Sequence, residues 1–168
     1  MENYDELETM FMDAVQARNA GDEARAEGLF KQILSAEPRM AEPRLELASI
    51  HLKRGDLDEA EAHAREALVQ LERGWRWLDT LSDEQMMAHA CNLLGEILKQ
   101  QSSRDDVLRR GDAAIKAIWQ EAGELFERAA EADPDNAEAI ANYIGFKKQR
   151  PPRSVTGPAT PGPSSIRR

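Results

Sequence analysis

Two stretches of this chain repeat one pattern at a fixed interval, and that interval constrains the fold more than any other feature. Gly21-Asp22 lies 34 residues before Gly55-Asp56, and Ala26 lies 34 residues before Ala60. A glycine followed by an aspartate is typical of a sharp turn between two helices, because the glycine adopts a left-handed backbone and the aspartate begins the next helix. The repeat therefore predicts two successive helical hairpins that stack and bury their apolar faces against each other.

The second copy is the more complete one. Gly55 is expected to end one helix, and Asp56 is expected to cap the next, with Glu59 completing a capping-box-like pattern. The helix that follows has small residues on one face, which lets two helix axes approach closely: Ala60, Ala64 and Ala67. This stretch alone predicts a closely packed helical hairpin.

Several residues at family-typical positions carry a resemblance. In the first copy they are Gly21, Ala26, Phe30 and Pro38, and in the second Leu47, Ala48, Gly55, Ala60 and Ala67. A third copy is divided between Leu94-Gly95 and a later group of Ala122, Phe126, Ala129 and Pro134. On these residues the chain resembles the tetratricopeptide-repeat (TPR) family, and within it the small bacterial-type adaptors. The resemblance implies an all-α, right-handed solenoid of about three helical hairpins.

The predicted organisation is one TPR domain over residues 1–150, followed by a basic tail over 151–168 rich in Pro, Gly and Ser. The hairpins are expected at about 5–38, 42–73 and 83–132, and a capping helix at 137–149. Leu94 lies 47 residues after Leu47, 13 more than the repeat, which indicates an insertion before the third hairpin. Ala122 lies 28 residues after Leu94, against 13 from Leu47 to Ala60, which indicates a second insertion inside the third hairpin. The tail has no apolar period and is predicted to be disordered.

Composition and charge limit the function classes. The single cysteine excludes an internal disulfide, and no leader or apolar span is evident, so the sequence predicts a cytoplasmic protein without a transmembrane segment. The formal net charge is −9, and the six cationic residues after Glu138 leave −15 for the rest. An acidic body argues against nucleic-acid binding by that body.

No motif for catalysis or cofactor binding occurs. Glycine-rich phosphate loops and paired-cysteine metal motifs are absent from the sequence, and no cofactor, metal or catalytic residue is predicted. The only candidates for a soft metal site are His51, His63, His89 and Cys91. His89 and Cys91 are two residues apart and point to different sides of a helix. These four residues are therefore interpreted as structural, and the protein as non-enzymatic.

The resemblance also implies where a partner binds. In the family the first helix of each hairpin lines a concave groove, and the matching positions here are Phe11, Met12, Val15, Leu45, Ser49, Leu52, Asn92, Leu93 and Glu96. Such a groove suits a partner peptide or helix. One subtype of the family grips a C-terminal carboxylate with lysines and asparagines; the equivalent positions hold Phe11, Val15, Glu46, His89 and Leu93, which argues against that subtype.

Trp75 and Trp77 lie in the segment that breaks the repeat. Two nearby indoles are interpreted either as an aromatic anchor for a partner or as a plug between displaced hairpins. The leading hypothesis is therefore a non-catalytic adaptor or scaffold that binds a protein or peptide in its groove. Two alternatives stay open: a self-associating structural protein, which allows a homo-oligomer, and electrostatic docking of the basic tail on an anionic partner.

Overall fold

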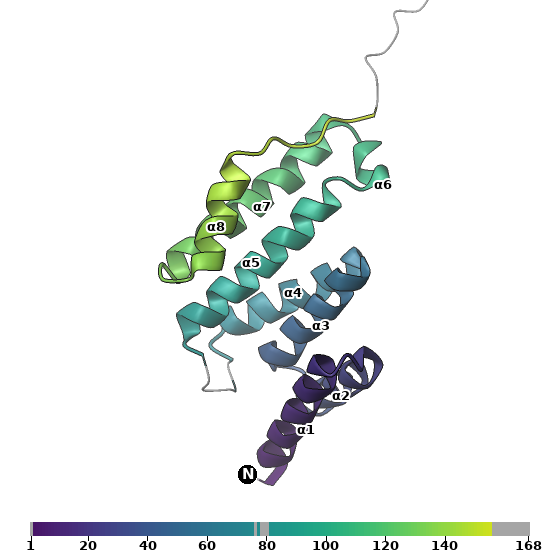
Figure 1. The fold of residues 1–168 in the computed structure, drawn as a ribbon, viewed down its shortest axis with the longest axis vertical. Helices are drawn as coiled ribbons and strands as arrows, with labels where there is room; N and C mark the ends of the chain where they lie inside the picture. The colour runs from purple at the N-terminus through teal and green to yellow at the C-terminus, as the bar shows by residue number, and fades with distance from the viewer. Residues whose placement is uncertain (1, 76, 78–80, 156–168) are drawn as a thin grey trace, which may run out of the picture.

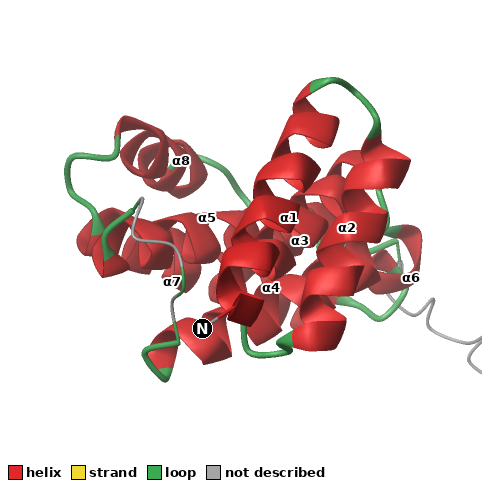
Figure 2. Cartoon of the chain, turned by 90° about the horizontal axis from the view of Figure 1, so that it is seen from below, coloured by secondary structure: helices red, strands yellow, loops and turns green. Residues whose placement is uncertain are grey.

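A computed structural model describes residues 2–75, 77 and 81–155 of the chain, with side chains from Tyr4 onward. Every regular element in the described part is a helix (Figure 2). The helices are α1 (Glu2–Asn19), α2 (Glu23–Ala36), α3 (Ala41–Arg54), α4 (Leu57–Glu72), α5 (Asp83–Gln101), α6 (Asp105–Leu108), α7 (Asp112–Ala132) and α8 (Ala137–Lys147). None of these helices is long and apolar enough to cross a membrane.

The helices pair as antiparallel hairpins that follow one another along the long axis of the molecule (Figure 1). The pairs are α1 with α2, α3 with α4, and α5 with α7. Each hairpin packs on the next, and α8 covers the last one. The prediction of an all-α solenoid of helical hairpins with a capping helix is confirmed.

The two predicted turns depend on glycine. Gly21 and Gly55 have φ values of 83° and 84°, in the left-handed region that a side chain disfavours. After the first turn, Asp22 caps α2 as expected, because its Oδ1 accepts a hydrogen bond of 3.1 Å from the backbone N–H of Arg25. These local signals were sufficient to predict where the hairpins turn.

The predicted cap at Asp56 is wrong. Asp56 occupies the residue before α4, but its side chain accepts no hydrogen bond from that helix. Its Oδ2 instead lies 3.5 Å from Nδ1 of His51, which sits one turn before the end of α3. The capping box in this chain is at α5, where Ser82 accepts from the N–H of Gln85 and the Gln85 side chain accepts from the N–H of Ser82.

Two hydrophobic cores meet at α3. Leu47 and Ile50 pack with the first hairpin, whereas Leu45 and Ala48 pack with the second and third. In α4 the predicted small-residue face is fully buried: Ala60, Ala64 and Ala67. α3 therefore serves both cores and positions the first hairpin relative to the rest.

The third hairpin accommodates its insertions as longer helices and the short α6. Its two helices have 19 and 21 residues, against 14 and 16 in the second hairpin. The extended end of α5 is fixed to the second hairpin, because the Gln101 amide donates to the backbone oxygen of Leu57 and to the carboxylate of Glu61. Despite the insertions, the hairpin stacks on its neighbour.

The chain after α8 differs from expectation over its first residues. Residues 151–155 lie along α7 (Figure 1), with the N–H of Ser154 donating to Asp112 and the N–H of Val155 donating to the Leu108 carbonyl. The predicted disorder is therefore corrected for 151–155, because the backbone N–H groups of Ser154 and Val155 donate hydrogen bonds to acceptors in α7 and α6. The rest of the predicted tail, 156–168, lies outside the described residues.

Candidate functional site

Side-chain contacts link α1, α3, α5 and α8 along the face that the family resemblance predicts to be concave, which we call the concave face. Arg18 of α1 forms an ion pair with Glu46 of α3, and the amide of Asn142 in α8 donates to Asn92 of α5 over 2.9 Å. His89 of α5 lies within electrostatic range of Arg18, Glu46 and Glu138. These contacts show that the first helices of the three hairpins and the capping helix share a surface.

The predicted groove residues divide into buried and accessible ones. Phe11, Leu45 and Leu93 are buried, with 7%, 2% and 8% of their surfaces exposed, and Phe11 packs on Phe30 with ring centroids 5.5 Å apart. These three side chains belong to the core and offer no surface to a partner. Met12 is 58% exposed. The remaining predicted positions are half-buried: Val15, Ser49, Leu52, Asn92 and Glu96.

The accessible part of the concave face is consequently more polar than expected. Asn92 is bonded to Asn142, and Glu96 pairs with Lys99 over 3.3 Å. His89 is exposed, yet desolvation by the surrounding helices lowers its pKa, while the carboxylates of Glu46 and Glu138 act in the opposite direction.

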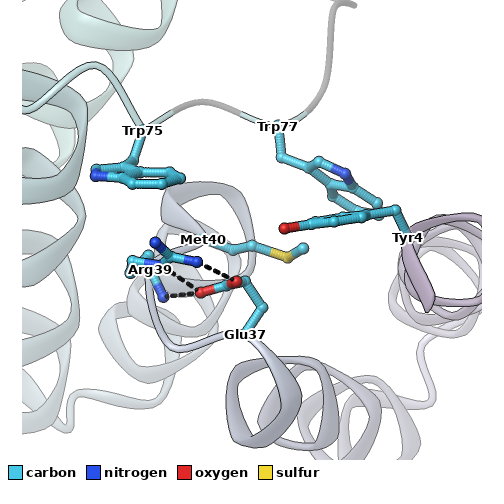
Figure 3. Close-up of a pocket in the computed structure, with 6 residues that line it drawn as sticks. All are labelled: Tyr4, Glu37, Arg39, Met40, Trp75 and Trp77. Carbon is cyan, nitrogen blue, oxygen red and sulfur yellow. Dashed lines mark hydrogen bonds and ion pairs between the residues drawn. The ribbon is translucent and has the colours of Figure 1, made fainter. Parts of the chain in front are cut away.

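A second feature is a pocket of about 290 Å³ at the end of the hairpins where α3 begins (Figure 3). We call it the aromatic slot; its lining residues are Tyr4, Glu37, Arg39, Met40, Trp75 and Trp77. Trp75 forms one wall, and Trp77 with Tyr4 forms the other, their ring centroids 6.3 Å apart. Met40 is buried at the base, with 3% of its surface exposed.

Charged groups fix the slot. The guanidinium of Arg39 lies 3.9 Å from the ring centroid of Trp75, a cation–π contact. It also donates two hydrogen bonds to Glu37, of 2.8 and 2.7 Å, and these hold the pKa of the Glu37 carboxyl below its usual value. The N–H of Trp77 donates to Glu42 of α3 over 2.9 Å. The walls of the slot are therefore apolar, and the two charged side chains that line it, Arg39 and Glu37, are paired with each other.

Comparison with known proteins identifies the repeats. A family model described as "Tetratricopeptide repeat" matches residues 17–72, from the end of α1 through α4. Residues 17–72 therefore carry tetratricopeptide repeats. This confirms the recognition from sequence and matches the hairpin architecture of the fold.

A solved TPR structure extends the likeness over most of the chain. It is titled "First TPR of Spaghetti (RPAP3) bound to HSP90 peptide SRMEEVD", and it aligns with a TM-score of 0.60 at 15% sequence identity. The alignment covers 84% of this chain and 90% of that one. At that identity the likeness shows the fold. A search of the curated proteins by sequence finds no match.

The two tryptophans of the aromatic slot have different environments. Trp77 is half-buried and packs against the core of the first hairpin, whereas Trp75 is 44% exposed. Trp77 thus fits the interpretation as a plug between hairpins. Trp75 fits the interpretation as an accessible aromatic anchor. Sequence reasoning missed Tyr4, Arg39 and Glu37, which reach the slot from α1 and the α2–α3 turn. No local pattern marks them, since they meet Trp75 only after the hairpins stack.

The histidines and the cysteine considered for metal binding do not form a metal site in the described residues. Over the described ranges, no cluster of three or more His, Cys, Asp or Glu side chains is arranged to hold a metal ion. Cys91 is fully buried, and this burial raises the pKa of its thiol to about 11. His51 and His63 stack on each other with ring centroids 5.6 Å apart. None of Cys91, His51 and His63 lines the aromatic slot, whereas His89, the fourth candidate, is exposed within electrostatic range of Arg18 and Glu46.

Proposed function

We propose that this chain is a non-catalytic protein-interaction module, an adaptor or scaffold, that binds a partner peptide or helix on its concave face. The observation that carries the proposal is the continuity of that face across four helices. Met12 and His89 are exposed, and His89 lies within electrostatic range of the Arg18–Glu46 pair. A hollowed surface made by stacked hairpins can contact an extended or helical segment along its length.

The charge of the face indicates the chemistry of the partner. Residues up to Glu138 carry a large excess of acidic side chains, and two of them, Glu46 and Glu138, lie near His89 on the concave face. A partner segment with apolar residues flanked by lysine or arginine complements this surface. We therefore propose an amphipathic, net basic segment as the ligand.

An acidic C-terminal peptide should fail to bind if the ligand of this chain is basic, and this can be tested. The similar solved TPR is bound to the peptide SRMEEVD. Of the five positions at which the clamp subtype of the family holds a carboxylate, Phe11 and Leu93 are buried here, and Glu46 is itself a carboxylate. We expect SRMEEVD to show no saturable binding to this chain in calorimetric titration. Saturable binding would contradict the proposed basic partner.

The positive test is selection from a random peptide library against the purified chain. Selected peptides should be net basic with apolar residues at helical or alternating spacing. The double variant Met12→Lys/His89→Lys adds positive charge to the concave face and should weaken their binding at least about tenfold.

The matched control is Val69→Lys on α4, an equally drastic change at a side chain that is 36% exposed on an outer helix. It should leave peptide binding unchanged. Peptides that bind both variants like the unaltered chain would place the binding surface elsewhere. The cytoplasmic location expected from the sequence stays a prediction.

A further inference from the structure

We propose that the aromatic slot binds the proline-rich segment 158–163 of a second copy of this chain, so that copies associate tail to slot. This inference uses a different surface from the concave face and is independent of the partner proposed for that face.

The walls of the slot suit a proline-containing segment. Trp75 on one side faces Tyr4 and Trp77 on the other, with Met40 at the base (Figure 3). Tyr4 and Trp75 are each 44% exposed, so both rings keep free surface although Arg39 covers part of Trp75. Aromatic-lined grooves bind proline-rich segments in many recognition modules, because the polyproline II backbone is already extended and loses little entropy on binding.

The chain already shows proline packed near an indole. Trp119 and Pro152 line the same pockets beside α7, and Pro152 is half-buried there. At one site within its own copy, a proline after α8 therefore borders the same pocket as a tryptophan. The same chemistry is available at the aromatic slot.

The sequence of the remaining tail supplies a fitting ligand. Pro158-Ala159-Thr160-Pro161-Gly162-Pro163 contains the P-x-x-P spacing that aromatic grooves recognise. Arg167 and Arg168 follow shortly after it. On α1, next to Tyr4, three acidic side chains are exposed: Asp5, Glu6 and Glu8. This charge arrangement favours a bound segment whose arginines lie over the start of α1.

Chain length requires a second copy. Val155 is bonded to Leu108, beyond the end of α5, whereas Trp75 and Trp77 precede the start of α5, at the opposite end of that helix (Figure 1). The 19 residues of α5 span about 28 Å. The six residues from 156 to 161 reach at most ~20 Å when fully extended. The proline segment of one copy cannot reach its own slot, so the occupant comes from another copy.

Association of the full chain tests this directly. Sedimentation across a concentration series should show a mass that rises with concentration. Trp75→Ala in the slot and Pro158→Ala/Pro161→Ala in the tail should each weaken self-association at least about tenfold. The tail variant alters no residue of the folded helices, so its effect has no folding explanation. The matched controls Val69→Ala and Ser164→Ala/Ser165→Ala should associate like the unaltered chain.

A synthetic peptide of residues 156–168 gives the second readout. In a Trp119→Phe background Trp75 and Trp77 are the remaining tryptophans, and the peptide should change their emission saturably and dissociate the assembly. A chain that stays monomeric throughout the series would overturn the proposal. So would variants that associate normally, or a peptide that binds Trp75→Ala unchanged.

Discussion

Gly95 of α5 has no room for a side chain. A Cβ at this position would lie 3.1 Å from the ring of Phe126, which is only 1% exposed. Gly28 of α2 is also inside a helix, yet a Cβ there would meet nothing within 4 Å. A side chain at Gly95 would therefore press on Phe126 between α5 and α7, whereas a side chain at Gly28 would press on no neighbour.

These two glycines make a matched pair. Gly28→Ala should raise the free energy of unfolding by about 0.5–1 kcal/mol, because glycine is the weaker helix former. Gly95→Ala should instead lower it by about 1–3 kcal/mol, since Phe126 must shift within a filled core. Urea unfolding measures both. Equal stabilisation by the two substitutions would show that the contact at Gly95 is loose.

The stacked histidines make the second hairpin sensitive to pH. The pKa of His63 is lowered, first by desolvation and then by His51, with Arg44 and Lys31 adding to the effect and Glu27 opposing it. Between the lowered pKa and the unfolded value near 6.5, the unfolded chain binds more protons. Stability is therefore complete above about pH 6.5 and is lost as the pH falls through that window.

His63→Gln should reduce the stability lost between pH 7.5 and pH 5, measured by urea unfolding at each pH. Carboxylates do not explain a loss in this window. The pKa of Glu27, for example, is lowered to about 2 by Lys31 and Arg54, so its contribution disappears only below its ordinary value of 4.5. An unchanged pH slope in the variant would assign the effect to His89, whose pKa is also lowered by desolvation.

At the scale of elements, α8 is a cap fixed by one aromatic side chain. Phe146 stacks on Trp119 and contacts Phe126, with ring centroids 4.5 and 5.1 Å apart. A Cβ on Gly123 would lie 2.9 Å from the Phe146 ring, so α8 lies directly against α7. Without α8, the aromatic face of the last hairpin would meet water, which is why a solenoid needs a cap.

Phe146→Ala should destabilise the protein by about 3–5 kcal/mol, because its ring is 7% exposed and fills the interface of α8 with α7. Ile144→Ala on the same helix removes a side chain that is 48% exposed and should cost under about 1 kcal/mol. Urea unfolding followed by far-UV circular dichroism measures the two. Similar losses for both would mean that α8 contributes by its helix alone.

The sequence predicts features that depend on neighbouring residues better than contacts between residues far apart in the chain. The turns at Gly21 and Gly55 follow from residues next to each other and were predicted. The orientation of α1 was not predicted. Phe11 and Met12 are adjacent in the sequence, so their side chains point about 100° apart around the helix axis. Packing of α1 on α2 decides that Phe11 is buried and Met12 is exposed. The aromatic slot was missed because Tyr4 and Trp75 meet only in the folded chain.

At the scale of the whole molecule, the two cores imply two regions of unequal stability. The first hairpin has its own core, joined to the rest through Leu47 and Ile50 of α3, and ion pairs of Lys53 and Arg54 with α2 lie at the same junction. The second and third hairpins share one larger core that α8 closes. A terminal hairpin covered on one side should open more readily than hairpins covered on both.

Hydrogen exchange should therefore be faster in α1 and α2 than in α5 and α7. Phe30→Ala, which removes a fully buried ring from the first core, should accelerate exchange in α1 and α2 and leave α5 and α7 close to their original rates. Phe126→Ala in the larger core should accelerate exchange from α3 to α8, and also in the first hairpin, because α1 and α2 depend on a folded α3. Mass spectrometry of peptides from each helix resolves these patterns. Equal acceleration throughout the chain by Phe30→Ala would show instead that the solenoid unfolds as one cooperative unit, with α3 coupling both cores too tightly for the first hairpin to open alone.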